Sequence, residues 1–201
     1  MDIPLHGSTA PGAGFEVPLE MLAACHGRVQ QHCELLQRLL AHVRQHGVDA
    51  QARDAAQRVL RYFDTAARDH HADEEQDLLP ALLEAMAGSD AVCIRDMIRR
   101  IGAEHRALEQ RWASLRETLL AWQRGEQVEP DEARGREFSE FIDAYAAHMA
   151  YEEAEVLPMA SRLLADDQLD AIGKAMRERR GITPLPAGLT APAQSGGTGS
   201  R

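Results

Sequence analysis

The sequence predicts an all-α protein: an antiparallel up-down-up-down four-helix bundle with a short fifth helix and disordered termini. The composition is the first reason, because 44% of the 201 residues are hydrophobic but only 4% are aromatic, and the helix formers Ala, Leu, Glu and Arg are abundant. Apolar residues also recur at steps of three and four along four long segments. Finally, these segments are joined by short connections, which favours antiparallel neighbours in a bundle.

Four of the five predicted helices end at a recognisable signal. Glycine is favoured just after a helix C-terminus, and it follows four of the segments, at Gly47, Gly88, Gly125 and Gly181. Pro80 and Pro158 fall inside the second and fourth segments, where each removes a backbone N–H, so we expect a kink or an early stop there. The predicted helices span residues 18–45, 49–87, 90–124, 130–165 and 167–179.

Both ends of the chain differ in composition from this helical region. Residues 1–16 are rich in Gly, Pro and small residues, and residues 181–201 are rich in Pro, Gly, Ser and Thr. Such segments bury too little apolar surface to fold by themselves. We therefore expect a flexible N-terminal segment at 1–16, a bundle domain at 17–180 and a disordered tail at 181–201.

The charge and the cysteines limit the partners and the compartment. The net charge is −10 with neutral histidines, which repels nucleic acid and anionic membranes. No apolar run approaches the ~20 residues of a membrane-spanning helix, and residues 1–16 carry no secretory signal. Cys25, Cys33 and Cys93 form no CxxC motif, and this odd number suits a reducing compartment. We expect a cytoplasmic protein with no nucleic acid or membrane partner; any protein partner is unknown.

The two halves of the chain resemble each other. A shift of 78 residues superposes the HxxxE motif at 70–74 on the HxxxE motif at 148–152. A shift of 79 residues superposes the apolar stripe of the first helix on that of the third, and the single polar residue in both stripes is histidine. The pair His71 and Glu75 also has i, i+4 spacing, but it has no counterpart because residue 149 is Met. The repeat therefore nominates six candidate metal ligands: His26, His70, Glu74, His105, His148 and Glu152.

The HxxxE spacing is suited to metal binding. Residues i and i+4 lie on one face of a helix, so each motif directs an imidazole and a carboxylate to one point inside the bundle. Two buried carboxylates without a cation repel each other, and one of them takes up a proton. Two divalent ions remove this cost if each glutamate bridges the pair. Imidazole and carboxylate suit iron, and also manganese or zinc.

These motifs resemble those of the bacterial haemerythrin-like (HHE cation-binding) domains. The residues that carry the resemblance, over about 18–165, are His26, the pair Glu104-His105, H70-x-x-x-E74-E and H148-x-x-x-E152-E. The resemblance implies a four-helix bundle whose cofactor is two iron ions in a non-haem di-iron centre. It implies binding of O2, NO or peroxide, for sensing, scavenging or redox defence. The alternative is an iron donor or store for the repair of damaged iron centres under nitrosative or oxidative stress, and the motifs leave open whether a substrate is turned over.

The chain departs from the oxygen carriers of that family in two places. Those proteins carry HxxxH on the third helix, whereas here Ile101 stands four residues before His105. They carry HxxxxD on the fourth helix, whereas here His148 is followed by Glu152 and Glu153. The resulting set of four His and two Glu resembles the repair-type branch more closely, although that branch often has an N-terminal cysteine and residues 1–17 have none. A third possibility is a structural or interaction bundle that its metals merely hold together.

Other polar residues near the stripes receive weaker assignments. We expect His71, Glu75 and Glu153 to lie beside the stripe, either at the surface or in contact with the ligands. Tyr145 lies one turn before His148, and it is either a core residue or a hydrogen-bond partner of a metal-bound oxygen. The remaining histidines are expected to be solvated: His6, His32, His42 and His46.

Overall fold

The structure is a computed structural model that describes residues 14–86 and 91–182. All regular secondary structure in these ranges is helical. The order is α1 (Pro18–His46), α2 (Ala50–Asp64), α3 (Ala66–Asp73), the π-helical turn η1 (Glu74–Leu78), α4 (Leu79–Ala85), α5 (Ala91–Gln123), α6 (Glu132–Tyr151), the π-helical turn η2 (Glu152–Val156), α7 (Leu157–Leu163) and α8 (Asp166–Arg179).

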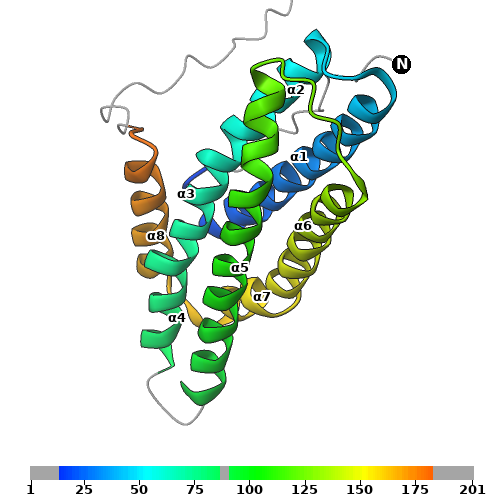
Figure 1. Ribbon diagram of the computed structural model, residues 1–201. Helices are drawn as coiled ribbons and strands as arrows, with labels where there is room; N and C mark the ends of the chain where they lie inside the picture. The colour runs from blue at the N-terminus through cyan, green and yellow to red at the C-terminus, as the bar shows by residue number, and fades with distance from the viewer. Residues whose placement is uncertain (1–13, 87–90, 183–201) are drawn as a thin grey trace, which may run out of the picture.

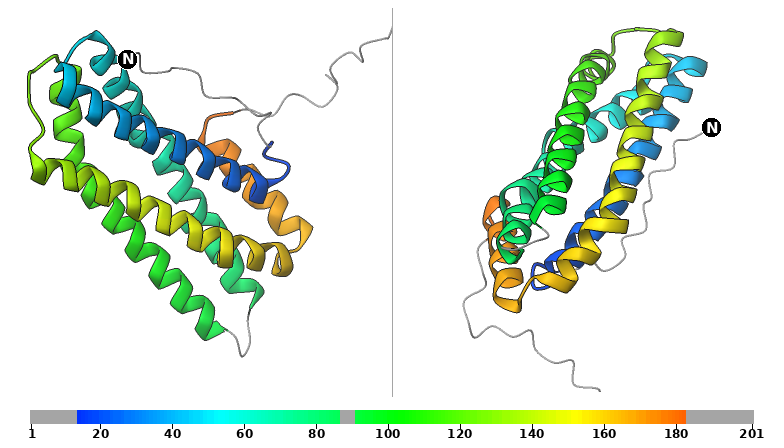
Figure 2. Two further views of the ribbon diagram at one scale, coloured as in Figure 1. Left: turned by 90° about the vertical axis from the view of Figure 1, so that its right-hand side faces the viewer. Right: turned by 90° about the horizontal axis from the view of Figure 1, so that it is seen from below.

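The helices form four antiparallel arms, as predicted. The second arm runs through α2, α3, η1 and α4, and the fourth runs through α6, η2 and α7. α1 packs against α2 and α6, and α5 packs against the same two helices, so the arms close a ring around one core. The right-hand view in Figure 2, from below, shows α1 and α6 on one side of the bundle and α5 with the second arm on the other. Within the described residues, no helix is long and apolar enough to cross a membrane.

The short fifth helix, α8, lies outside the ring of four. It packs against α1, α3 and η1, and Figure 1 shows it beside the lower half of the second arm. Asp73 is fully buried at this contact, and it forms ion pairs with Arg179 and with Arg180, whose Nη2 lies 2.5 Å from Asp73 Oδ2. α8 is therefore attached beside Glu74 by a buried carboxylate and two arginines.

The predicted second helix is broken once within its length. Thr65 separates α2 from α3, and its hydroxyl donates to the Arg61 carbonyl at 2.7 Å. Threonine that bonds to the carbonyl four residues back competes with the regular helix and bends it. The apolar period continues through this point, so the sequence predicts one uninterrupted helix over residues 49–87. Its predicted end, at Ala87 and Gly88, lies outside the described residues.

The prolines widen the helices instead of ending them. Because Pro80 has no N–H, the helical ladder shifts just before it, and the Leu79 N–H bonds to the Glu74 carbonyl five residues back. The same shift occurs before Pro158, where the Leu157 N–H bonds to the Glu152 carbonyl. Each proline then lies in the first turn of the next α-helix, where a missing N–H is tolerated. The expected early stop is wrong, and the disturbance is a π turn that contains a candidate ligand.

The core consists of two apolar clusters with a polar layer between them. One cluster includes Val29, Leu108 and Tyr145, and the other includes Leu22, Ile101 and Val156. Every arm passes from one cluster to the other, and every arm carries a histidine at the crossing. On α1, for example, His26 lies between Leu22 and Val29. The candidate ligands therefore share one level of the bundle.

The structure changes the assignment of some residues outside this layer. His42 is buried, with 9% of its surface exposed, and its Nε2 lies 3.0 Å from Asp49 Oδ2, so the expectation that it is solvated is wrong. His32 is half-buried and stacks on Tyr62, whereas His46 is exposed as expected. His6 and the tail 183–201 lie outside the described residues. At the N-terminal end, residues 14–16 contact α8, since Glu16 Oε1 lies 3.0 Å from Arg177 Nη2.

Candidate metal centre

The six residues nominated by the repeat lie together in the polar layer. They come from all four arms, and none of them exposes more than 3% of its surface: His26 on α1, His70 on α3, Glu74 on η1, His105 on α5, His148 on α6 and Glu152 on η2. Their imidazole nitrogens and carboxylate oxygens point toward one another. The side chains thus form a buried polar cluster inside an apolar core.

The distances between these donors are those of ligands around a common ion. The shortest, 3.1 Å, joins His105 Nε2 to His148 Nε2. Two donors about 2.1 Å from one ion, at angles between a right angle and a tetrahedral angle, are about 3.0–3.4 Å apart. Four further separations fall in this range: His26 Nε2 to Glu152 Oε2 at 3.2 Å, His148 Nε2 to Glu152 Oε1 at 3.3 Å, and Glu74 to His70 Nε2 and to His105 Nε2 at 3.4 Å each.

The six residues form two overlapping groups, each of which can hold a metal ion. One group is His26, His70, Glu74 and Glu152, and the other is Glu74, His105, His148 and Glu152. Within each group the donor atoms lie within 4.8 Å of one another. Both glutamates belong to both groups. The arrangement has the composition of a dinuclear site with two shared carboxylates.

Three outer carboxylates orient the histidines. The Nδ1 atoms of His26, His105 and His148 lie 3.0, 2.7 and 2.9 Å from Glu153, Glu75 and Glu104 respectively. An ionised carboxylate only accepts, so each Nδ1–H donates and each Nε2 keeps its lone pair for the interior. Glu75 and Glu153 therefore contact the histidines, one of the two expectations for them. The role of Glu104 was not predicted from the sequence, although its position directly before His105 is part of the motif.

The unpaired nitrogen and oxygen atoms of this cluster are those that a bound cation would satisfy. With Nδ1–H of both rings donating outward, the Nε2 lone pairs of neutral His105 and His148 face each other across 3.1 Å, which is unfavourable unless a cation or proton lies between them. Six further buried atoms have no hydrogen-bond partner among the described residues: His26 Nε2, both ring nitrogens of His70, Glu74 Oε2 and both oxygens of Glu152. Native proteins leave few buried polar atoms unpaired, so the cluster fits a metal centre better than a hydrogen-bonded core.

Comparison with known proteins agrees with the geometry. Residues 17–160 match the family described as Hemerythrin HHE cation binding domain. The chain belongs to this family. An uncharacterized protein of Haemophilus influenzae is 31% identical over 173 residues, which cover 85% of this chain and 94% of that relative. The fold and the clustered His and Glu residues of this haemerythrin HHE domain are therefore those of a cation-binding bundle.

Burial sets the protonation of the site in the HHE domain without a cation. Burial, followed by the charge of Glu152, raises the pKa of Glu74 well above its usual value. Burial and the neighbouring histidines lower the pKa of His70 well below its usual value. Burial also acts to lower the pKa of His26, but the nearby carboxylates, Glu152 foremost, outweigh it, and that pKa is raised. The pocket thus disfavours a second negative charge unless positive charge compensates it.

The repeat symmetry of the HHE domain is imperfect in two places. Glu104 supports His148, but the equivalent position beside His70 is Cys25, which accepts a hydrogen bond from Arg28 at 2.9 Å. His70 Nδ1 is accordingly left without a hydrogen-bond partner among the described residues. The second difference is His71, whose counterpart is Met149. His71 exposes only 7% of its surface and its ring stacks on that of His105. Of the two positions expected for it, the surface is therefore wrong, and contact with a candidate ligand is confirmed.

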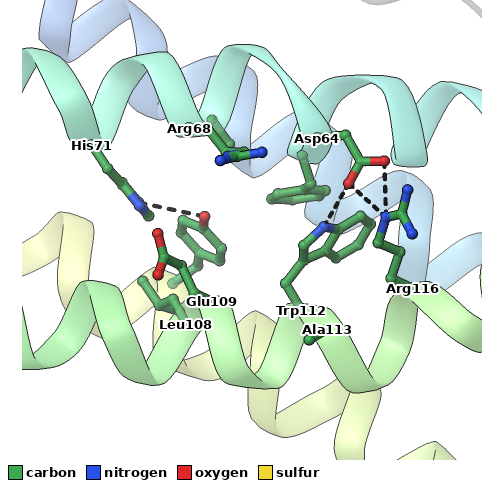
Figure 3. Close-up of a pocket in the computed structure, with 11 residues that line it drawn as sticks. Asp64, Arg68, His71, Leu108, Glu109, Trp112, Ala113 and Arg116 are labelled. Atoms are coloured by element: carbon green, nitrogen blue, oxygen red, sulfur yellow. Dashed lines mark hydrogen bonds and ion pairs between the residues drawn. The ribbon is translucent and has the colours of Figure 1, made fainter.

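Two clefts reach the centre from opposite sides. The first, of about 410 Å³, lies between α2–α3 and α5 and ends at His71 and Tyr145. Figure 3 shows its outer wall, where the Asp64 carboxylate accepts hydrogen bonds from Trp112 and Arg116. The second, of about 540 Å³, lies between α1 and α6 and ends at His26, Met149 and Glu153. The two clefts are related by the internal repeat, so each half of the HHE domain has its own approach.

Proposed function

We propose that this chain is a non-haem di-iron protein that binds O2, NO or peroxide at a carboxylate-bridged centre. The observation that carries the proposal is the sharing of Glu74 and Glu152 between the two ligand groups. In this assignment His26 and His70 would hold one ion, His105 and His148 would hold the other, and Glu74 and Glu152 would serve both. When bound, two redox-active ions supply reversible electron transfer to a small ligand, and manganese or zinc could occupy the same donors.

The residues of the chain would support that chemistry in three ways. Glu75, Glu104 and Glu153 keep the proton of each imidazole on Nδ1, so that Nε2 faces the interior. The two apolar clusters around the polar layer exclude bulk water and lower the local dielectric, which strengthens every charge interaction within it. The cleft that ends at His71 and Tyr145 offers a route whose volume far exceeds that of a diatomic molecule.

An absorption experiment tests the proposal. Protein purified without oxygen and loaded with Fe²⁺ should develop a near-ultraviolet or visible band when O2, NO or peroxide is added, and the band should depend on which ligand is used. Loaded Glu74→Gln protein is the matched control, and it should give a weaker or absent band because one bridging carboxylate is lost. A spectrum that none of the three ligands alters would contradict the proposal.

A second candidate function is the supply of iron to damaged centres. The four-His, two-Glu set favours it, because that set resembles the repair-type branch. In that case reduction should release iron, and an apo acceptor should take it up. Retention of both ions after reduction would exclude this role. If the purified protein instead contains zinc and shows no ligand-dependent spectrum, a purely structural role for the metals is favoured.

A further inference from the structure

His71 breaks the symmetry of the centre in a way that the ligand motifs do not describe. Its ring stacks on that of His105, with centroids 3.9 Å apart and planes 9° apart. The side chain is buried, although a neutral histidine in an apolar core normally needs hydrogen-bond partners. The repeat counterpart, Met149, is half-buried and offers only a thioether, a weak and soft ligand. The two halves therefore present different donors at this position.

The donor atoms of His71 lie close to those of two proposed ligands. His71, His105 and His148 form a third group whose donors are all within 4.8 Å of one another, and all three residues are buried. No equivalent third histidine lies near His26 and His70 among the described residues. Among the described residues, His71 has a single hydrogen bond, between its Nε2 and the Tyr145 hydroxyl at 3.5 Å, the outer limit for such a bond. This long contact leaves the imidazole free to take a better partner.

We propose that His71 is a third imidazole ligand of the ion held by His105 and His148. The two metal positions then differ, since one has three histidines and the other has two, while both share Glu74 and Glu152. This inference rests on the proposed dinuclear centre, and it adds that the two ions bind with unequal affinity. Tyr145 competes with the ion for His71, so its hydroxyl holds the ring in place when the position is empty.

Titration of the metal-free protein with Zn²⁺ by calorimetry tests the assignment. The wild type should bind two ions per chain in two distinguishable steps. His71→Met copies the residue of the other half, and it should weaken the tighter step about tenfold or more while leaving the weaker step unchanged. Tyr145→Phe should leave the tighter step as strong as in the wild type or stronger.

A matched control separates ligation from packing. Met149→Leu changes the same layer in the other half with little change in volume, so both binding steps should persist. Thermal melting of each metal-free variant shows whether the fold is intact. If His71→Met gives the wild-type isotherm, or if Met149→Leu weakens the tighter step equally, His71 is not a ligand but the dinuclear centre stands. If the wild type binds fewer than two ions, both proposals fail.

Discussion

His26 donates from Nδ1 to Glu153 across 3.0 Å, and the two residues come from opposite halves of the repeat. The equivalent bond, from His105 to Glu75 at 2.7 Å, crosses the halves in the other direction. The shared glutamates follow the same rule, since each ligand group takes three residues from one half and one glutamate from the other. Neither half therefore contains a complete site, and the centre forms only when the four arms assemble.

Removal of a proposed ligand should reduce metal content and stability together. His70→Ala and His148→Ala are expected to lose metal. They should then lose the stabilisation that metal binding provides, which is about 3 kcal/mol when the free metal concentration is about a hundred times the Kd. Elemental analysis and thermal melting with and without a chelator measure both quantities. His46→Ala, at an exposed position, should match the wild type. Full metal retention in either ligand variant would contradict its assignment.

Much of this fold and site was predictable from the sequence, because helices and their i, i+4 pairs are local. The 78-residue repeat separated His70 and Glu74 from the adjacent pair His71 and Glu75, and all six nominated side chains converge. Contacts between arms depend on packing that no local pattern encodes. The sequence therefore left two positions open for Glu75 and Glu153, the surface or contact with the ligands, and did not show that they bond to histidines of the other half.

Other features were predictable only in part from the sequence, or not at all. The repeat itself counted against His71, because its counterpart is Met149, yet packing of α3 against α5 brings His71 onto His105. Pro80 predicted a disturbance, but the apolar period could not show that the ladder would shift to a π turn containing Glu74. The burial of Asp73 beneath α8 likewise depends on how a surface helix docks.

The outer carboxylates should tune metal affinity without changing the fold. Glu153→Gln, Glu75→Gln and Glu104→Gln are each expected to weaken metal binding about 10–100-fold, because the amide no longer holds the proton on Nδ1 as strongly. Competition with a chromogenic chelator measures the change. Glu155→Gln provides the control, since Glu155 is exposed on the same π turn as the proposed ligand Glu152. If the three variants bind metal as tightly as the wild type and Glu155→Gln, the hydrogen bonds do not support the proposed ligands.

The π turns should matter for binding more than for folding. Pro80 is exposed, so Pro80→Ala leaves no cavity and restores an N–H that favours the α-helical ladder. The register between Glu74 and Leu79 should then change and displace the Glu74 carboxylate, so metal affinity should fall although the metal-free protein melts at the same temperature or higher. Calorimetric titration beside a thermal melt checks this. Unchanged affinity would show that the π turn does not position Glu74.

Glu74 should make the metal-free protein less stable as the pH rises. Its pKa is raised in the folded state, so the charged form is disfavoured by folding, and stability falls as pH increases from the unfolded pKa of about 4.3 toward the folded value. Metal-free Glu74→Gln should therefore exceed the wild type by roughly 1–2 kcal/mol at neutral pH. The advantage should vanish near pH 4, which chemical denaturation at several pH values will measure. A constant difference at every pH would contradict this account.

The attachment of α8 should respond asymmetrically to mutation. Replacing Arg179 and Arg180 together by Ala leaves Asp73 buried without a partner and should cost about 3–5 kcal/mol. Asp73→Asn should cost less, because the part-exposed arginines can turn to water. Urea denaturation of the metal-free proteins compares the two. A larger loss of unfolding free energy in Asp73→Asn than in the double arginine variant would contradict this prediction.

X-ray absorption spectroscopy of the iron-loaded protein, with elemental analysis of the same sample, tests the central claim most directly. The account predicts two iron ions per chain, nitrogen and oxygen neighbours at about 2.0–2.2 Å, and an iron–iron vector of about 3.5–4 Å that weakens or disappears in Glu152→Gln protein. One iron per chain, or two irons without an iron–iron vector, would contradict a centre bridged by Glu74 and Glu152.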